Sequence, residues 1–319
     1  MSIVTDLRFD GKVAIVTGAG NGLGRQHALL LAARGASVVV NDIGGSTSGS
    51  GWDSGPAETV VREIRDRGGE AVADTNTVAT PAGGAAIVRT ALDAYGRVDV
   101  LVNNAGILRD APFEDITPDL LDPVIDVHLK AMFHVTGPAW RVMRDQGYGR
   151  VVNTTSAAGL LGTPRKSNYG AAKAGVVGFT RALALEGAEH NIRVNAIAPI
   201  AATRMLTESL ADVDGAAAAL MNAVVDRLDP ALVSPVVAFL GHEECPVTGE
   251  IYTTGAGQVA RFFIGRTAGY FHPALSIEDV REHLAEIRDE AGYTIPANPR
   301  EEIAALMRVV AAKPKSPTT

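Results

Sequence analysis

The chain has 319 residues, of which 46% are hydrophobic and 20% are charged, and it contains 34 glycines and 16 prolines. This composition supports a folded core and excludes a disordered, collagen-like or coiled-coil protein. Thirty-six acidic and 29 basic residues give a net charge of −7, with no block of Lys or Arg. Binding to nucleic acid or to an anionic membrane surface is therefore not expected.

The start of the chain and its cysteine content bear on the cellular compartment. The first ten residues include Asp6, Arg8 and Asp10, where a secretory signal needs an apolar run, and no later run approaches the ~18 residues of a membrane span. Cys245 is the single cysteine, so we expect neither an internal disulfide nor a bound metal. These features predict a cytoplasmic protein.

Apolar, β-branched runs of four or five residues alternate with longer segments of helical period, which is typical of parallel βαβ units. We therefore predict an α/β fold built on a single Rossmann-type, doubly wound parallel sheet. The expected strands are Lys12–Thr17, Ser37–Asn41, Ala71–Ala73, Val98–Val102, Arg150–Asn153, Arg193–Ile197 and Ile251–Thr253. The expected helices between them are Leu23–Arg34, Ala57–Arg67, Ala82–Ala94, Leu120–Gln146 and Tyr169–Glu189.

Two segments interrupt this alternation, and a third follows it. Residues 44–55 are mostly Gly and Ser and predict a long loop. Residues 199–228 change to polar turns with a short alanine-rich helix, and we interpret them as a substrate lid. The segment after Gly257 predicts two amphipathic helices, Ser276–Ala291 and Pro299–Ala312.

The first predicted strand leads into a glycine-rich turn, Thr17-Gly-Ala-Gly-Asn-Gly-Leu-Gly24, and then into a helix. A dinucleotide-binding fingerprint requires this strand–turn–helix context. Glycines allow the backbone to approach a pyrophosphate, and the free N–H groups and dipole of the helix N-terminus attract it. The alternative is a tight turn without a ligand. The expected contacts in the turn are Gly18, Asn21, Gly22, Leu23 and Gly24.

Asp42 closes the second predicted strand, 18 residues beyond Gly24. A carboxylate there can accept hydrogen bonds from the adenosine ribose and would repel a 2′-phosphate. Neither the turn nor the position after Asp42 carries a Lys or Arg, and Arg25 comes only after the last glycine. We therefore expect NAD rather than NADP, the alternative being a solvated strand-end aspartate.

Tyr169 and Lys173 are four residues apart on a predicted helix, so their side chains share one face. Lowering a phenol pKa from ~10 to near 7 costs ~4 kcal/mol, which a close ammonium, a cationic nicotinamide and partial desolvation can jointly supply. Tyr169 then becomes a usable general base. Ser156 ends the fifth predicted strand, so its hydroxyl is expected at the same sheet edge, where it would orient a substrate oxygen.

Four motifs in this order, the glycine turn, Asn103-Asn-Ala-Gly106, Ser156 and Tyr169-Gly-Ala-Ala-Lys173, resemble the short-chain dehydrogenase/reductase family. The resemblance covers about residues 9–257, which we assign to a dinucleotide-binding catalytic domain, and residues 258–319 become a helical C-terminal extension. It implies that the tyrosine is the catalytic acid/base, that the lysine binds ribose and lowers the tyrosine pKa, and that the serine positions the substrate carbonyl.

The resemblance also implies further cofactor contacts and one departure. The family usually has an asparagine at the position of His128; this imidazole can pass a proton or anchor a water, or it can be a buried structural histidine. The usual Pro-Gly after the sixth strand is Pro199-Ile200 here, and Asn76 replaces an adenine-side aspartate. The expected cofactor contacts beyond the turn and Asp42 are Asn76, Thr77, Asn104, Ala105, Gly106, Tyr169, Lys173, Pro199, Ile200 and Thr203.

A narrower resemblance is to the (3R)-hydroxyacyl-CoA dehydrogenase domain of the peroxisomal multifunctional β-oxidation enzymes. These enzymes are also called 17β-hydroxysteroid dehydrogenase type 4. It rests on Phe9-Asp-Gly-Lys-Val13, on Val38-Val-Val-Asn-Asp-Ile-Gly-Gly45 with its glycine loop, on Asn103-Asn-Ala-Gly-Ile-Leu-Arg-Asp110 and on Val127-His-Leu-Lys130. It implies NAD-dependent oxidation of a fatty or steroid-bearing (3R)-hydroxyacyl-CoA to the 3-oxoacyl-CoA, with 17β-hydroxysteroid oxidation as a further activity.

Other functions stay open at this stage. An NADPH-dependent 3-oxoacyl-carrier-protein reductase is disfavoured by Asp42 and by the acidic net charge, because its carrier protein is itself acidic. A free-steroid or polyol dehydrogenase remains open because the lid sequence does not reveal a substrate. A non-catalytic NAD-binding scaffold is the alternative of another class. The family resemblance further implies a homodimer or homotetramer.

Overall fold

The computed structural model describes residues 6–204 and 225–312. Its strands are β1 (Val13–Thr17), β2 (Ser37–Asn41), β3 (Glu70–Asp74), β4 (Val100–Asn103), β5 (Gly149–Thr154), β6 (Ile192–Pro199), β7 (Ile251–Gly255) and β8 (Gln258–Phe262). Its helices are α1 (Gly22–Ala33), α2 (Gly55–Asp66), α3 (Pro81–Tyr95), α4 (Pro118–Ile125), α5 (Ala131–Gln146), α6 (Ala157–Leu161), α7 (Ser167–Glu186), α10 (Ser234–Gly241), α11 (Ile277–Glu282), α12 (Leu284–Ile287) and α13 (Pro299–Ala312). Short 3₁₀ turns lie at Phe113–Asp115, Ala188–His190, Val225–Arg227 and Pro230–Leu232.

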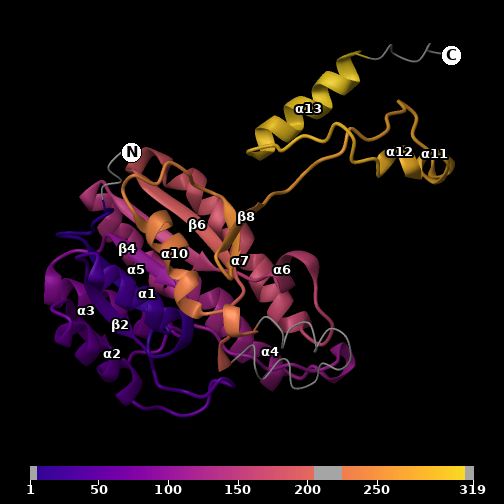
Figure 1. The fold of residues 1–319 in the computed structure, drawn as a ribbon. Helices are drawn as coiled ribbons and strands as arrows, with labels where there is room; N and C mark the ends of the chain where they lie inside the picture. The colour runs from indigo at the N-terminus through magenta and orange to yellow at the C-terminus, as the bar shows by residue number, and fades with distance from the viewer. Residues whose placement is uncertain (1–5, 205–224, 313–319) are drawn as a thin grey trace. The chain divides into compact units, whose positions relative to one another are not determined.

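The strands form one sheet in the order β3-β2-β1-β4-β5-β6-β7-β8 (Figure 1). The register is parallel from β3 through β7, which confirms the predicted Rossmann-type sheet. The sequence analysis missed β8, which is joined to β7 by only Ala256 and Gly257 and must therefore run antiparallel. Its side chains are mostly exposed, so it lacks the apolar run of a buried strand.

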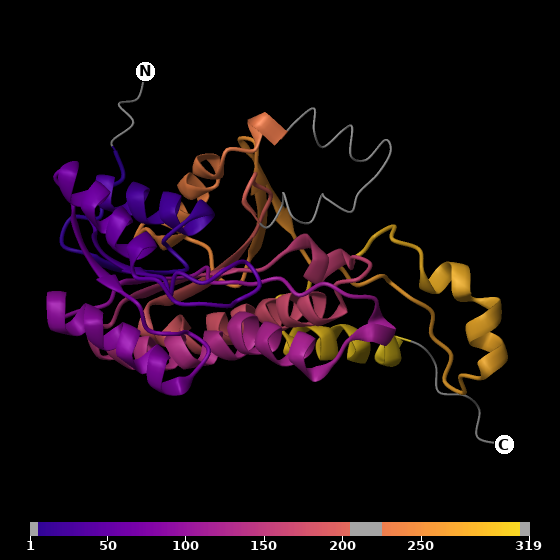
Figure 2. The same cartoon turned by 90° about the horizontal axis from the view of Figure 1, so that it is seen from below.

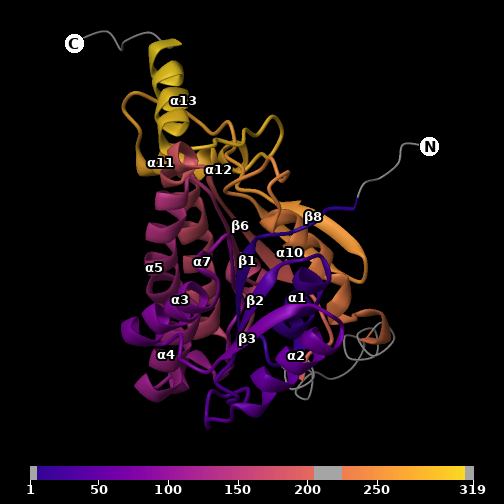
Figure 3. The same ribbon diagram turned by 90° about the vertical axis from the view of Figure 1, so that its left-hand side faces the viewer.

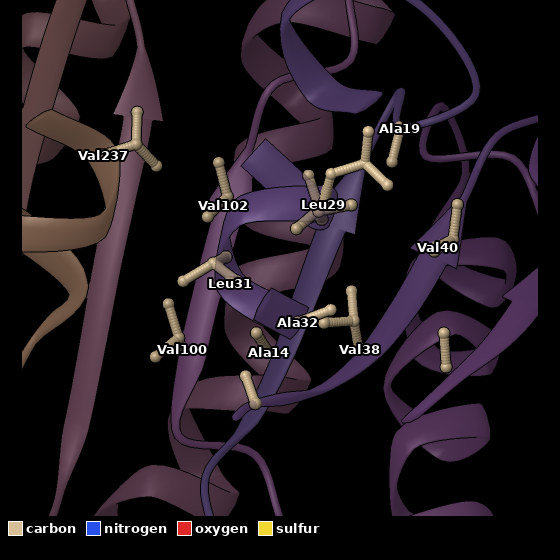
Figure 4. Packing of buried hydrophobic residues seen from close by; sticks show 14 of the residues in the cluster. Ala14, Ala19, Leu29, Leu31, Ala32, Val38, Val40, Val100, Val102 and Val237 are labelled. Carbon is tan, nitrogen blue, oxygen red and sulfur yellow. The ribbon is translucent and has the colours of Figure 1, made fainter. Parts of the chain in front are cut away.

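Helices cover both faces of the sheet (Figures 2 and 3), with α1, α2 and α10 on one face and α3, α5 and α7 on the other. Successive residues of β1 face the two layers in turn. Ala14 (Figure 4) packs with Val16 in the core under α1 and α10, and Val13 and Ile15 pack in the core under α3 and α5. Each fully buried Val or Ile contributes ~1.5–3 kcal/mol relative to an exposed one, so these strands stabilise the sheet whose carboxyl edge carries the site.

The predicted helix Leu120–Gln146 is a single run of helical backbone with a change of geometry inside it. Between α4 and α5 lies a five-residue π-helical segment, η2 (Asp126–Lys130). Pro123 interrupts the hydrogen bonding of α4, and such π insertions are frequent at functional sites. Periodicity alone could not reveal the insertion, because it shifts the helical register without ending the helix.

The chain divides by its internal contacts into two units, Met1–Arg261 and Phe262–Thr319. In the second unit the predicted helix Ser276–Ala291 was wrong in length: it is two short helices, α11 and α12, with His283 between them. A capping box between Ser276 and Asp279 starts α11 as expected. The other predicted helix matches α13. Within the first unit, the predicted lid 199–228 falls partly outside the described residues.

Candidate active site

The glycine turn between β1 and α1 is shaped to bring backbone close to a ligand. Gly18 has φ of 64° and Gly22 has φ of 50°, a left-handed conformation that side chains rarely adopt. A Cβ on Gly24 would stand 2.2 Å from the carbonyl oxygen of Gly18. The cap residue Asn21 makes no side-chain bond to the helix N–H groups, so these groups are available to a pyrophosphate. The turn therefore fits a dinucleotide.

Thr17 joins the glycine turn to the segment after β4. Its buried hydroxyl accepts hydrogen bonds from the backbone N–H of Asn104 at 3.0 Å and of Ala105 at 3.1 Å. The Asn104 amide returns bonds to the carbonyls of Thr17 and Gly18 at 3.0 and 3.1 Å. A Cβ on Gly18 would stand 2.8 Å from the Ala105 Cα. The two segments that we expect to contact the cofactor therefore form one rigid edge.

Asp42 lies at the end of β2 beside this turn and holds two backbone amides. One carboxylate oxygen accepts the N–H of Gly20 at 2.8 Å and the other that of Gly44 at 2.7 Å. Each oxygen keeps a lone pair for a ribose hydroxyl. The nearby Arg25 is ion-paired with Glu63 of α2, so its guanidinium is already engaged by a carboxylate.

A network at the end of β3 lies where we expect the adenine. Asp74 is buried and accepts hydrogen bonds from Asn41, Asn76 and Thr90, at 2.7, 2.8 and 2.6 Å. Because Asp74 can only accept when ionised, Asn76 turns its Nδ2 toward it and keeps Oδ1 for another donor. The sequence analysis named Asn76 and Thr77 but missed Asp74; a carboxylate at the end of a predicted buried strand was the available signal.

Pro199 ends β6 at the same edge, and Ile200 and Thr203 follow it. The Ile200 N–H donates to the Thr254 carbonyl at 2.8 Å, which extends the pairing of β6 with β7. The methyl group of Thr203 would lie 3.5 Å from a Cβ on Gly22, so this residue stands directly over the glycine turn. All three predicted contacts therefore lie beside the predicted cofactor position.

Ser156, Tyr169 and Lys173 come together where the carboxyl end of β5 lies beside the start of α7. Ser156 caps α6, accepting the Ala158 N–H at 3.2 Å. Lys173 is buried, its Nζ donates to the Thr154 carbonyl at 2.6 Å, and it lies 5.7 Å from the centre of the Tyr169 ring. The helical spacing therefore places both side chains as the sequence predicts.

Burial shifts the protonation of this pair. It lowers the pKa of Lys173 to about 7 because the ammonium loses hydration. It raises the pKa of Tyr169, although a hydrogen bond with Ser156 opposes that rise. The protein alone therefore does not create a phenolate, and the charge of a bound nicotinamide is needed to bring the phenol pKa down.

His128 lies in η2 and packs edge-on against Tyr169, with ring centres 5.1 Å apart. Its Nε2 lies 3.1 Å from the backbone nitrogen and 2.7 Å from the carbonyl oxygen of Ile107. Burial and the charge of Lys173 lower its pKa well below the usual value, so the imidazole is neutral. Its Nδ1 is buried and has no hydrogen-bond partner among residues 6–204 and 225–312.

The described part of the chain shows neither a metal site nor a membrane span. No three His, Cys, Asp or Glu side chains among the described residues are grouped to hold a metal ion. None of the described helices is both long and apolar enough to cross a bilayer. Cys245 is buried and unpaired with another thiol.

Residues 12–214 match the family model for short chain dehydrogenase. The chain belongs to this family and is an oxidoreductase. It is 48% identical over 285 residues to a short-chain type dehydrogenase/reductase of Mycobacterium tuberculosis, covering 89% of this chain and 96% of that one. It is 42% identical over 312 residues to the peroxisomal multifunctional enzyme type 2 of Mus musculus, covering 97% of this chain but only 41% of that one.

Other relatives are more distant or have solved structures. A 3-oxoacyl-[acyl-carrier-protein] reductase of Synechocystis is 39% identical over 251 residues, 78% of this chain and 97% of that one. The full-length peroxisomal multifunctional enzyme type 2 of Drosophila melanogaster superposes with a TM-score of 0.79 at 35% identity, covering 96% of this chain and 50% of that one. A 7α-hydroxysteroid dehydrogenase, solved with NADH and a 7-oxo bile acid, has a TM-score of 0.68 at 30% identity, covering 78% and 95%. The family binds NAD or NADP.

Proposed function

We propose that the protein oxidises a (3R)-hydroxyacyl-CoA, fatty or steroid-bearing, to the 3-oxoacyl-CoA of β-oxidation, with NAD as the oxidant. The observation that carries this proposal is the convergence of Tyr169, Lys173 and Ser156 on the sheet edge that holds the glycine turn and Asp42. The similarity to peroxisomal multifunctional enzymes over nearly the whole chain supports the substrate class. Oxidation of a 17β-hydroxysteroid is a further activity of the same kind.

The side chains divide the work of alcohol oxidation. The Ser156 hydroxyl holds the substrate oxygen in place, and Tyr169 accepts the hydroxyl proton. Lys173 holds the nicotinamide ribose and favours the ionised phenol by its charge. The neutral imidazole of His128, beside the Tyr169 ring, can relay the proton outward. NAD, when bound, supplies the hydride acceptor.

Large apolar side chains around this edge suit an acyl chain or steroid. Phe113 is 80% exposed in the turn after β4, and Leu161 is 74% exposed at the end of α6, the helix that Ser156 caps. Trp52, in the glycine loop, is 66% exposed. Exposed apolar groups of this size favour contact with an apolar ligand.

Replacing Asp42 by Asn tests the cofactor. Asn keeps an acceptor oxygen but removes the charge that would repel a 2′-phosphate, so the ratio of kcat/KM for NADP to that for NAD should rise about 10-fold or more, equivalent to ~1.4 kcal/mol. Steady-state kinetics with both cofactors measures this ratio. Asp53→Asn is the matched control, because the Asp53 carboxylate, in the nearby glycine loop, accepts the Gly55 N–H at 2.9 Å; a similar shift in both variants would refute the role of Asp42.

A biosynthetic 3-oxoacyl-carrier-protein reductase is the second function in view, since such a reductase is 39% identical. The engagement of Arg25 by Glu63 disfavours the NADPH that it would use. Initial rates with short-chain, long-chain and steroid-bearing hydroxyacyl-CoA, each with NAD and NADP, discriminate the two. Absence of turnover with any alcohol would favour a non-catalytic scaffold. We further propose, as expected from the sequence, that the protein is a cytoplasmic homodimer or homotetramer.

A further inference from the structure

Asn168 is buried in the first turn of α7, directly before Tyr169. Its Nδ2 donates hydrogen bonds of 2.8 Å to the carbonyls of Arg109 and of Leu120. Its Oδ1 accepts the N–H of Tyr169 at 2.7 Å, one of the first amides of a helix, which no helix carbonyl can satisfy. Both amide hydrogens are thus used to tie the backbone of Tyr169 to two other segments.

Arg109 adds a further bond at the junction where Asn168 joins α7 to α4. It bonds a carbonyl of α4 that receives no helix hydrogen bond because of Pro123. In α4 the Asp119 carbonyl would normally accept the N–H of residue 123, but proline has none. The Arg109 guanidinium donates to that carbonyl instead, and its Nε donates to the Ser48 carbonyl at 3.0 Å. The first turn of α4 is therefore held by Arg109 and Asn168 together.

The Ser48 contact extends this junction to the glycine loop, residues 44–55. The Leu108 N–H also donates to the loop, to the Thr47 carbonyl at 2.9 Å. The loop itself begins at Gly44, whose N–H is bonded to Asp42. The loop backbone from Gly44 to Ser48, with the hydrogen bonds at its two ends, therefore connects the carboxylate at the predicted adenosine end to the backbone of the predicted base.

We propose that Asn168 is a positioning residue for Tyr169, and that Arg109 links it to the glycine loop. This inference rests on the proposed function, in which Tyr169 is the acid/base. Asn168 is buried and its side chain bonds three backbone groups, so it acts through Tyr169 by setting where the phenol stands relative to Ser156 and Lys173. A geometric error of about 1 Å at a reacting group can cost roughly 100-fold in rate, so this placement is directly measurable.

The experiment compares Asn168→Ala with Asn195→Ala in the full chain. Asn195 is an equally buried asparagine that bridges two backbone groups, the Val247 carbonyl at 2.9 Å and the Glu250 N–H at 3.1 Å, away from Tyr169. Both variants should lose thermal stability. Only Asn168→Ala should lower kcat roughly 10- to 100-fold while the Kd for NAD stays within about twofold.

The pH profile gives a second readout. A phenol displaced from Ser156 loses the hydrogen bond that lowers the pKa of Tyr169, so the acidic limb of kcat should move to higher pH in Asn168→Ala alone. The same pKa can be read without turnover, from the ultraviolet titration difference between each protein and its Tyr169→Phe derivative in the presence of NAD. This readout separates the present inference from the proposed function, because it holds even if no alcohol is turned over.

Arg109→Met provides a variant that leaves the buried amide in place. It should keep a melting temperature close to that of the wild type and should shift kcat and the Tyr169 titration in the same direction as Asn168→Ala. If Asn168→Ala loses only stability, with kcat, the pH limb and the titration matching those of Asn195→Ala, the side chain is merely structural and the proposal fails. If Arg109→Met matches the wild type in both readouts, the link to the loop is wrong.

Discussion

Tyr169→Phe is expected to abolish turnover while the protein keeps its fold and its affinity for NAD. The substitution removes only the hydroxyl, and the phenyl ring still packs against His128. A positioned general acid/base contributes roughly 10²- to 10⁴-fold to a rate, so kcat should fall by about that factor. Initial rates of NADH formation from a hydroxyacyl-CoA measure the loss, and calorimetric titration measures NAD binding.

Tyr95→Phe is the matched control for this substitution. Tyr95 is the last residue of α3 and packs against the core under α3 and α5, so losing its hydroxyl should leave kcat unchanged. A Tyr169→Phe protein with wild-type kcat would show that another group takes the proton. A protein that no longer binds NAD would instead show that the phenol supports the cofactor rather than the chemistry.

Local sequence patterns were sufficient for the elements that need only their own residues. The buried strands are continuous apolar runs, the glycine turn stands between a strand and a helix, and Tyr169 and Lys173 share a helix face through their spacing. In each case the hydrophobic period or the steric requirement involves only residues that are close together in the sequence. The edge on which the site lies then follows from the doubly wound parallel sheet, whose ligands bind at the carboxyl ends of the strands.

Features that depend on pairing over long separations could not be predicted. Strand β8 is an exposed edge whose pairing with β7, and not its apolar content, makes it a strand. The π-helical segment that carries His128 continues the helix between α4 and α5 without a break, so no local end signal marks it in the sequence. The bond from Arg109 to Asp119 requires knowledge of which carbonyl Pro123 leaves without a donor. These features depend on contacts between residues that are far apart in the sequence, and a local sequence pattern does not specify such contacts.

Lys173→Met should impair catalysis and also remove a pH dependence of stability. The variant keeps an unbranched side chain one atom shorter but loses the ammonium beside Tyr169 and its bond to the Thr154 carbonyl. In the variant the nicotinamide charge alone would favour the ionised phenol, and the ribose would lose its proposed contact, so kcat/KM should fall roughly 100-fold or more. Lys12→Met, at the start of β1 where Lys12 pairs with Glu243, is the matched control and should keep full activity.

The stability effect has a definite sign in the protein without cofactor. In the folded state the pKa of Lys173 is lowered from 10.5 to about 7, so between these values the unfolded chain binds more protons than the folded one. The free energy of unfolding of the wild type should therefore rise with pH across this window, by an amount on the order of a few kcal/mol. Below about pH 7 both states carry the charge, and the cost of burying it is fully present.

Lys173→Met should lack this rise, so wild type and variant should differ in pH dependence while Lys12→Met follows the wild type. Urea unfolding between about pH 6 and pH 9, where tyrosines stay protonated, measures the difference. Parallel stability profiles for the wild type and Lys173→Met would mean that the ammonium remains charged in the folded protein. In that case the cation stays permanently beside Tyr169, and the phenol pKa would be held down even before NAD binds.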